Sequence, residues 1–354
     1  MKRVRSIVAP LACALLLLGC GRYNKSGFVY WSLSPEANNL AFSWCGYEES
    51  LCTIALYTFK TGELKLFRNT TGRNWSRPNF SSDGRQLVFS IATPDSDDRQ
   101  IAVMNSDGSG LRVVTQGKGY RTLPAFSNDG KKLTYLCAGG MTEKYWTPYK
   151  GSTRRLRDKE ICVVDLLTGQ ENKITSLGAY AYSRPSFMSD GKKVLFHYKG
   201  GKKNPDTKKT NTFEFNIAQH IEKPKSETVL SEMPLANNPR ISNDGRRVVF
   251  SARSNEMDRG KLKSGYFNYD LFLWEGSSDI LNSKGTIRRL TRAQSYLSGY
   301  ALSMDGRKIA YAFDKERNGK MRFFLMDIDG GEVQEFSIPE KPDGWIGPGS
   351  SPSP

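Results

Sequence analysis

The sequence predicts an all-β fold, a six-bladed β-propeller of four-stranded antiparallel blades. Three observations support this prediction: a turn motif recurs six times, β-type runs flank the copies, and a second pair of such runs follows each copy. Internal repeats of this kind indicate stacked units that bury their apolar faces against their neighbours. Four antiparallel strands per unit, repeated around an axis, are typical of a propeller.

Each copy has an apolar residue, usually a small hydroxyl residue, one further residue, a dipeptide that is Asp-Gly in five of the six copies, and then an apolar run. The copies span 30–43, 77–90, 123–136, 184–197, 238–251 and 299–312. Asp-Gly between β-type runs predicts a tight hairpin in which both turn residues have positive φ. Glu36-Ala37 replaces it in the first copy, so that turn must be built differently. The motif aspartates are interpreted as turn formers rather than metal ligands; they are Asp83, Asp129, Asp190, Asp244 and Asp305.

The second strand pair is clearest at 101–115, 161–175 and 323–336, looser at 54–67 and 271–291, and least regular near 213–230. Proline opens four of the first strands, where no ladder donor is lost. Successive motif acids, counted from Glu36, are 47, 46, 61, 54 and 61 residues apart. We expect these length differences to fall in loops around a constant set of strands.

The N-terminus is expected to lie outside the fold. A basic start precedes an apolar stretch from Ile7 to Leu18, and Gly19-Cys20 follows. This pattern resembles a bacterial lipobox, with residues 1–19 as a signal peptide and a lipid such as palmitate on Cys20; an ordinary secretory signal is the alternative. Gly21 favours the outer membrane, so we expect an anchor on its periplasmic face. Residues 20–27 are then a linker, 28–338 the propeller and 339–354 a disordered tail rich in Pro, Gly and Ser.

Four cysteines remain after Cys13 and Cys20 are set aside, an even number in an oxidising compartment. Cys45 and Cys52 flank a short loop, and Cys137 and Cys162 flank a longer one. Each pair is therefore predicted to form a disulfide. Metal or thiol chemistry is the alternative, but the chain contains no Cys-x-x-Cys and only His197 and His220 as histidines.

The formal net charge is +16, and removal of the three basic signal residues leaves +13. Such a charge attracts anionic partners. Outside the cytoplasm we expect these to be an envelope protein, an acidic glycan or lipid headgroups, and not nucleic acid. The segments 138–160, 199–212 and 252–268 carry net charges of +3, +4 and +2, which supply +9 of that total.

These three basic segments are predicted to be loops between the second and third strands of neighbouring blades, and so to share one face. Loops on a rigid scaffold commonly carry binding residues, although charged loops also serve solubility alone. The candidate partner-binding residues are Lys144, Tyr145, Trp146, Arg154, Arg155, Arg157, Lys202, Lys203, Lys208, Lys209, Arg259, Lys261 and Lys263.

The repeat resembles that of TolB-like propellers, which also occurs in the propellers of prolyl oligopeptidases. The resemblance covers about 28–338 and implies the fold, because function on such a scaffold resides in its loops. TolB has an additional N-terminal domain, and prolyl oligopeptidases have an α/β-hydrolase domain with a Gly-x-Ser-x-Gly elbow. Neither is expected here.

Catalysis has little support in the sequence. No Ser-His-Asp spacing, phosphate loop or histidine cluster stands out, and His197 is interpreted as a packing residue. The chain is therefore predicted not to be an enzyme, with no catalytic residues, metal or cofactor. We expect a monomeric, lipid-anchored binding or scaffold module for protein partners. The alternatives are a binder of anionic envelope glycan or lipopolysaccharide and a carbohydrate-active enzyme (a lyase or hydrolase).

Overall fold

The structure is a computed structural model, and its description covers residues 26–46, 51–67, 73–92, 96–141, 145–147, 151–153, 156–177, 181–203, 210–222, 227–229, 237–253, 269–278, 284–293, 296–314 and 321–339. The regular elements in these ranges are β-strands. None of the described segments forms a helix long and apolar enough to cross a membrane. The expected signal peptide and Cys20 lie outside these ranges, as do residues 340–354 of the expected tail.

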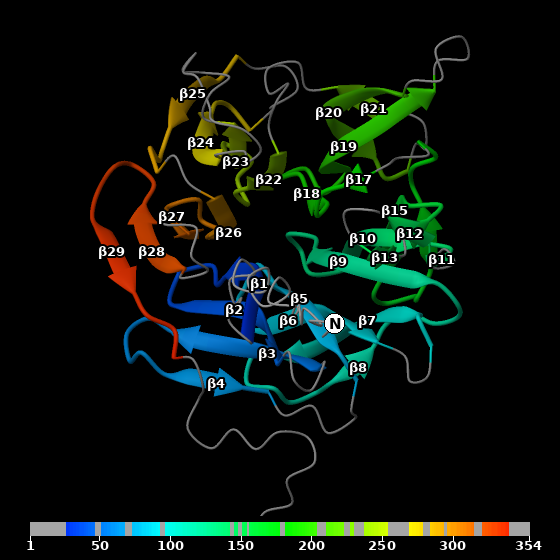
Figure 1. Ribbon diagram of the computed structural model, residues 1–354, viewed down its shortest axis with the longest axis horizontal. Helices are drawn as coiled ribbons and strands as arrows, with labels where there is room; N and C mark the ends of the chain where they lie inside the picture. Colours follow the sequence, from blue (N-terminus) through cyan, green and yellow to red (C-terminus); the bar gives the residue numbers. More distant parts are fainter. Residues whose placement is uncertain are drawn as a thin grey trace, which may run out of the picture.

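The described strands form six antiparallel units arranged in a ring (Figure 1), and a single parallel pairing, Arg99 with Tyr120, joins the second and third units into one sheet. Blade one contains β1 (Ser26–Leu33), β2 (Asn39–Gly46), β3 (Leu51–Thr58) and β4 (Leu64–Leu66). Blade two contains β5 (Trp75–Phe80), β6 (Gln86–Ala92), β7 (Arg99–Asn105) and β8 (Arg112–Val113). Blade three contains β9 (Tyr120–Phe126), β10 (Lys132–Ala138), β15 (Glu160–Asp165) and β16 (Glu171–Lys173).

Blade four contains β17 (Ala181–Tyr182), β18 (Ser186–Phe187), β19 (Lys193–Lys203), β20 (Thr210–His220) and β21 (Glu227–Val229). Blade five contains β22 (Asn237–Ile241), β23 (Arg247–Arg253), β24 (Tyr269–Glu275) and β25 (Thr286–Arg289). Blade six contains β26 (Tyr296–Leu302), β27 (Lys308–Asp314), β28 (Arg322–Asp327) and β29 (Val333–Phe336). In blade four both β17 and β18 pair with β19, so the first strand of this blade is interrupted between them.

Six apolar clusters hold the ring together, one at each junction between neighbouring blades. The junction of blades two and three, for example, buries Val88 and Ile101 against Phe126, Leu133 and Tyr135. The other five clusters join the remaining pairs of neighbours in the same way. A fold in which each blade packs on two neighbours is what the sixfold repeat predicts.

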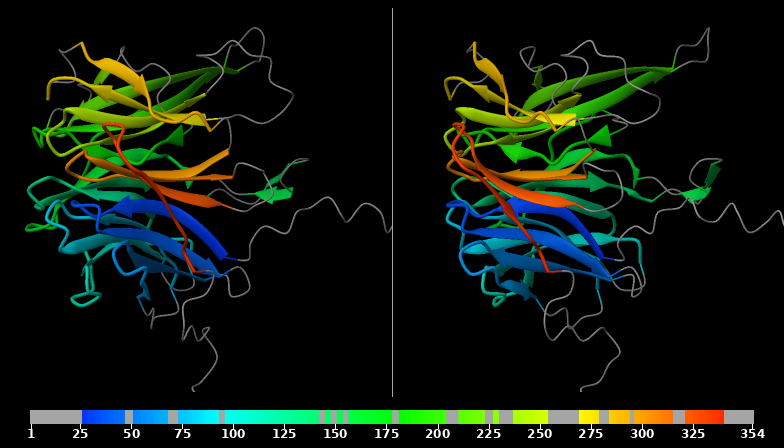
Figure 2. Two further views of the ribbon diagram at one scale, coloured as in Figure 1. Left: turned by 90° about the vertical axis from the view of Figure 1, so that its left-hand side faces the viewer. Right: turned by 60° about the vertical axis from the view of Figure 1, so that its left-hand side comes forward.

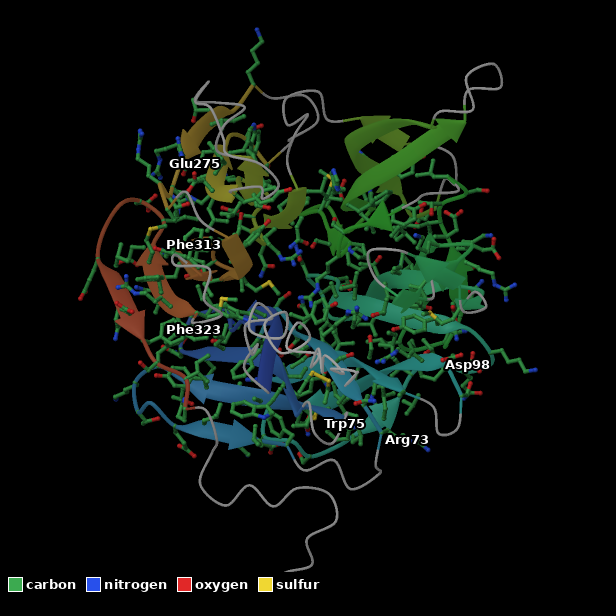
Figure 3. The ribbon with its side chains drawn as sticks, viewed as in Figure 1. Arg73, Trp75, Asp98, Glu275, Phe313 and Phe323 are labelled. Atoms are coloured by element: carbon green, nitrogen blue, oxygen red, sulfur yellow. A yellow bond between two sulfur atoms is a disulfide. The ribbon has the colours of Figure 1, made fainter. Side chains whose placement is uncertain are left out.

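The ring closes by packing between its ends. Blade one is formed by N-terminal strands and blade six by C-terminal strands, and within the described residues no strand passes from one to the other. Trp31 of blade one stacks on Phe323 of blade six with ring centroids 5.5 Å apart. Tyr57 stacks on Phe336 at the same centroid distance. Figure 3 labels Phe323 at this junction.

The repeated motif forms the turn between the first and second strands of a blade. In blade two, Ser81 Oγ donates to Asp83 Oδ1 at 2.6 Å, and the backbone N–H of Arg85 donates to the same oxygen at 3.0 Å. The N–H of Gly84 donates to the carbonyl of Ser81 at 2.9 Å, which closes a β-turn over the Asp. The Ser-Asp arrangement recurs at Ser127, Ser242 and Ser303.

The predicted turn conformation is wrong in one respect. Gly84 has φ of 71° and its counterparts are also positive, but none of the motif aspartates is among the residues with positive φ. The turn is longer than a two-residue hairpin, because the N–H of Ser81 donates to the carbonyl of Gln86. In the first copy Ala37 takes the glycine position with φ of 58°. Blade one therefore keeps the turn geometry without Asp-Gly.

Both expected disulfides are present. Cys45 and Cys52 are joined across a directly paired position of β2 and β3. Cys137 and Cys162 are joined diagonally, because Cys137 pairs in register with Glu160 and Cys162 with Tyr135. Each disulfide ties the second strand of its blade to the third strand, at or near the base of the loop that connects them.

A second repeated arrangement, a threonine hydroxyl bonded to a buried carboxylate, fixes the third strand of two blades. Thr175 Oγ1 accepts from the N–H of Ile161 at 2.9 Å and donates to buried Glu160, which also accepts from the N–H of Leu177. In blade five, Thr291 Oγ1 accepts from the N–H of Leu271 and donates to Asp270, at 2.9 Å each. These carboxylates accept hydrogen bonds from backbone N–H groups at the point where the chain leaves the fourth strand of each blade. We therefore assign them a structural role.

Candidate functional site: the central channel and the insertion face

The ring has two unlike faces. The Ser-x-Asp-Gly turns lie on one, here called the turn face, and the loops between second and third strands lie on the other, the insertion face (Figure 2). The additional strand pairs β11 (Gly140–Met141) with β14 (Leu156–Arg157), and β12 (Tyr145–Thr147) with β13 (Gly151–Thr153), belong to the insertion face. The first strands of the blades surround the axis between these faces.

A cavity of about 50 Å³ lies on the axis near the turn face. Each blade contributes to its wall the residue two positions before the turn Ser (Met188 in blade four). These six residues are Ser32, Asn79, Ala125, Ser186, Arg240 and Ala301. Five of the six are small or uncharged, so Arg240 places a cation where the other blades have none.

The position four residues before the turn Ser is conformationally unusual. Tyr30, Arg77, Leu123 and Asn238 occupy it in blades one, two, three and five, with φ between 54° and 63°. The strand pairing shifts register at each of these positions, as in a β-bulge. Left-handed backbone costs a non-glycine residue roughly 1–2 kcal/mol, and such strain persists where surrounding structure fixes it, often at functional sites.

Arg184 occupies the same position in blade four, in the break between β17 and β18. It is 2% exposed and lines the axial cavity. Its Nη1 donates to the backbone carbonyl of Trp31 at 3.4 Å. Because Trp31 belongs to blade one, the side chain of Arg184 extends across the channel to the opposite side of the ring. Its Nε has no hydrogen-bond partner among the described residues.

Arg77 holds a second guanidinium beside the channel. Its Nη2 donates to the hydroxyl of Tyr30 at 2.7 Å, and its Cζ lies 4.2 Å from the centroid of the Tyr30 ring. Its Nη1 donates to Thr122 Oγ1. Tyr30 is 41% exposed, so this stacked pair is accessible to solvent while Arg184 is not.

Arg240 is the third arginine at the channel, after Arg184 and Arg77. Its Nη1 donates to the carbonyl of Pro239 at 3.3 Å, and its Cζ lies 5.8 Å from the ring centroid of Tyr300. Burial raises the pKa of the Tyr300 hydroxyl to about 12, so it is neutral at physiological pH. Its hydroxyl donates to the carbonyl of Asn238 at 2.5 Å. Tyr300 therefore supplies Arg240 with an aromatic neighbour but no negative charge.

Burial and the neighbouring positive charges change the pKa of the arginines at the channel, Arg184 in particular. Burial, and then the positive charges of Arg240 and Arg77, lower the pKa of Arg184. Burial also lowers the pKa of Arg240. None of the described residues that line the cavity is acidic. The guanidinium groups of Arg184 and Arg240 therefore line one cavity, with the charge of Arg77 acting on Arg184 from nearby, and no carboxylate among the described wall residues neutralises them.

At the turn face the channel is bridged by a direct contact between two blades that are not neighbours. Asn128 Nδ2 of blade three donates to the carbonyl of Asn243 of blade five at 3.1 Å. Both residues lie in the cavity wall. This pair therefore spans the cavity wall on the side of the short turns.

The predicted partner-binding residues are placed only in part. Arg157 is exposed on β14 of the insertion face. The backbones of Tyr145 and Trp146 lie on β12, and those of Lys202 and Lys203 at the end of β19. The following residues lie outside the described part of the chain: Lys144, Arg154, Arg155, Lys208, Lys209, Arg259, Lys261 and Lys263. Their role as a binding surface stays a prediction.

No group of three or more His, Cys, Asp or Glu suited to hold a metal ion occurs among the described residues. His197 is 8% exposed within β19, and its backbone N–H donates to Ser183 Oγ at 2.8 Å.

Arg77, Arg184 and Arg240 are not among the site residues predicted from the sequence. A signal was present, because Arg-Pro occurs at the same repeat position in 77–78 and 184–185. A charged residue that opens a buried strand has to face either solvent or the axis. In a ring with this repeat, that position faces the axis.

Fold and repeat together define a six-bladed propeller of the TolB type. Residues 28–264 match the TolB beta propeller domain family, and the chain belongs to this family. Bacterial TolB-like propellers are typically periplasmic, and they support a protein-binding role for the module.

Two solved structures illustrate the similarity of fold. TolB from Acinetobacter baumannii is 16% identical, with a TM-score of 0.55 over 89% of this chain and 66% of that one. The β-propeller domain of the Trilobed protease from Pyrococcus furiosus, described as having an open velcro topology, is 12% identical, with a TM-score of 0.52 over 88% of this chain and 84% of that one. A closure without strand exchange is also what the described residues of this chain show.

The prediction that the chain is not an enzyme is wrong as it was made. A curated relative, dipeptidyl-peptidase 5 from Porphyromonas endodontalis, is 36% identical over 61 residues, which are 16% of this chain and 9% of that protein. The propeller domain of a protease shares the fold. This chain covers 66% of the length of TolB from Acinetobacter baumannii and 9% of the length of dipeptidyl-peptidase 5, which is less than two thirds of each. Propellers of this type also occur in enzymes. The lack of familiar catalytic motifs in the sequence therefore does not distinguish a binding module from an enzyme.

Proposed function

We propose that the chain is a lipid-anchored propeller of the bacterial cell envelope that binds a protein partner on its insertion face. The observation that carries the proposal is the asymmetry of the two faces. The turn face consists of short turns, whereas β11–β14 and the 11-residue strands β19 and β20 extend the insertion face. Loops and hairpins on a rigid scaffold are the usual place for binding residues.

The charge of this face indicates an acidic partner. Lys199, Lys202 and Lys203 lie on β19, and exposed Arg157 lies on β14. Complementary charge increases the rate at which partners meet and selects among them. The membership of the TolB family supports binding of a protein over binding of nucleic acid.

The envelope location rests on three supporting observations. Residues 1–19 have the pattern of a lipoprotein signal, with Cys20 as the acylation site. The two disulfides suit an oxidising compartment. The family is typically periplasmic in bacteria. The outer membrane, as suggested by Gly21, is part of the proposal.

Crosslinking in cells tests the partner. The triple variant Arg157→Glu, Lys202→Glu, Lys203→Glu reverses three charges on the insertion face. Its matched control, Lys131→Glu, Lys192→Glu, Arg307→Glu, reverses three exposed charges at turns of the opposite face. We expect the first variant to lose at least about tenfold of a specific crosslinked protein, a magnitude that corresponds to roughly 1.4 kcal/mol, and the control to retain it. Equal capture by both variants, or equal loss, would contradict the proposal.

The anchor has its own test. Metabolic labelling with an alkyne analogue of palmitate is expected to label the wild type and not Cys20→Ser. The variant is expected to leave the membrane fraction while it keeps both disulfides. Label on Cys20→Ser, or an unlabelled wild type, would contradict lipidation without affecting the partner proposal.

A second candidate ligand is an anionic envelope glycan, favoured by the Tyr30–Arg77 pair. An exposed aromatic ring beside a guanidinium suits a sugar that carries a carboxylate or phosphate. Sedimentation with purified peptidoglycan or lipopolysaccharide would then depend on Tyr30, and Tyr30→Ala would reduce it. Unchanged sedimentation of this variant would remove the glycan candidate.

A further inference from the structure

The central channel contains a buried charge that the protein itself does not neutralise. Arg184 is 2% exposed, and within the described part of the chain the one hydrogen bond of its side chain is the 3.4 Å contact with the carbonyl of Trp31. A guanidinium has five N–H donors, so most of those of Arg184 are left for another acceptor. Its Nε is without a partner among the described residues.

The surroundings increase this imbalance. Arg240 shares the cavity wall with Arg184, and its own Nε is likewise buried and unpartnered within the described residues. Arg77 adds a third positive charge nearby, and the described wall contains no acidic residue. Buried ionised groups are normally paired, because burial removes their hydration without replacement. An anion would supply what the wall lacks.

The cavity has the size and the chemistry for a small oxyanion. Its volume of about 50 Å³ corresponds to roughly three to five water-sized positions at about 10–15 Å³ each. Ser186 and Asn79 bring further polar groups to the wall, and the Ser186 hydroxyl and the Asn79 amide N–H are donors of the kind that an oxyanion accepts from. Guanidinium groups form short, paired hydrogen bonds with carboxylates and phosphates.

We propose that this cavity binds one small oxyanion, a carboxylate or phosphate group, between Arg184 and Arg240. The anion neutralises the axial charge and links blades four and five to blade one through the Arg184–Trp31 contact. The site is separate from the proposed partner surface on the insertion face and does not depend on it.

Thermal unfolding at constant ionic strength tests the proposal, with sodium chloride replaced stepwise by phosphate or by acetate. We expect the midpoint of the wild type to rise by about 3 °C or more at saturating oxyanion, because a ligand that binds the folded state stabilises it. A response to phosphate alone identifies a phosphate site, and a response to acetate alone identifies a carboxylate site. No response to either, relative to chloride, overturns the proposal.

Two variants assign the response to the site. Arg184→Met removes the buried charge, so it is expected to abolish the oxyanion response without lowering the midpoint in chloride. Arg85→Gln, at an exposed turn, is the control and keeps the full response. If Arg184→Met does not fold, Arg240→Gln replaces it, with an expected weakening of the apparent oxyanion affinity of at least about fivefold. A full response in Arg184→Met, or unchanged affinity in Arg240→Gln, overturns the assignment.

Discussion

Arg184 of blade four donates a hydrogen bond to the backbone carbonyl of Trp31 in blade one, across the channel, at 3.4 Å. The contact connects opposite sides of a ring whose other interactions run mainly between neighbouring blades. Trp31 also stacks on Phe323, so one residue joins the axial arginine to the closure of the ring. The axis and the closure are therefore structurally linked.

The closure makes a direct prediction for stability. Phe323 is 8% exposed and belongs to the apolar cluster between blades six and one. Phe323→Ala is expected to lower the free energy of unfolding by about 3–5 kcal/mol, as other large-to-small core substitutions do. Leu167→Ala is the control, because Leu167 is 93% exposed, and it should change stability by less than about 0.5 kcal/mol. Urea unfolding of both variants measures this, and similar values for the two would contradict closure by packing.

The buried carboxylates at the blade exits give a second prediction. Asp270 has no exposed side-chain surface and pairs with Arg289 at 2.5 Å, whereas Asp329 is 66% exposed and pairs with Arg247 at 2.7 Å. Asp270→Ala is expected to cost about 3–5 kcal/mol, because it removes the carboxylate that buried donors and the largely buried guanidinium of Arg289 contact. Asp329→Ala is expected to cost less than about 1 kcal/mol. Chemical unfolding distinguishes the two; an equal effect would count against the anchoring role.

The turn aspartates make stability depend on pH. The hydrogen bond from Ser81 Oγ, and then that from the N–H of Arg85, lower the pKa of Asp83 below its ordinary value of 3.8. Ser127 Oγ lowers the pKa of Asp129 in the same way. A carboxyl whose pKa is lower in the folded chain contributes stability above about pH 3.8 and loses it as the pH falls through the folded value.

The corresponding measurement compares the wild type with Asp83→Asn, Asp129→Asn in urea between neutral pH and about pH 2.5. The variant should be less stable at neutral pH, by under about 1 kcal/mol per turn because the carboxylates are exposed. The difference should shrink as the pH falls below 3.8. A difference that stays constant or grows in acid would show that the carboxylate charge is not what stabilises the turns.

The two disulfides should contribute unequally. Their sequence separations are 25 residues for Cys137–Cys162 and 7 for Cys45–Cys52. Chain entropy predicts losses of about 3.5 and about 2.4 kcal/mol when the respective pairs are replaced by alanine. Unfolding midpoints of the two double variants, each compared with the disulfide-bonded wild type, measure the order. The reverse order would mean that local packing outweighs the constraint on the unfolded chain.

Local patterns allowed most of the fold to be predicted from the sequence. Ser-x-Asp-Gly and its flanking apolar runs identified the blades, because the turn is stabilised by contacts within six residues, such as that of Ser81 with Gln86. The conformation of Asp83 was predicted wrongly, since the same dipeptide also fits a longer turn in which only the glycine has positive φ. The cysteine pairing followed from loop positions.

The axial site was not predicted, and the reason is geometric. Arg184 and Arg240 lie 56 positions apart in different repeats, and only closure of the ring brings them to one cavity. Charge clusters within loops were the functional signal in the sequence, whereas each of these arginines stands alone among uncharged residues. The bulge that displaces Arg77 also depends on strand pairing, which a single-strand pattern does not reveal.

Anomalous diffraction from crystals equilibrated with selenate tests the axial site most directly, because selenate is an oxyanion that can be located by its selenium atom. We predict one selenium peak on the propeller axis, with selenate oxygens about 2.7–2.9 Å from nitrogens of Arg184 and Arg240. An axis that binds neither selenate nor, in crystals equilibrated with acetate, a carboxylate, with Arg184 still directed at the carbonyl of Trp31, would contradict the assignment of this cavity to an anion.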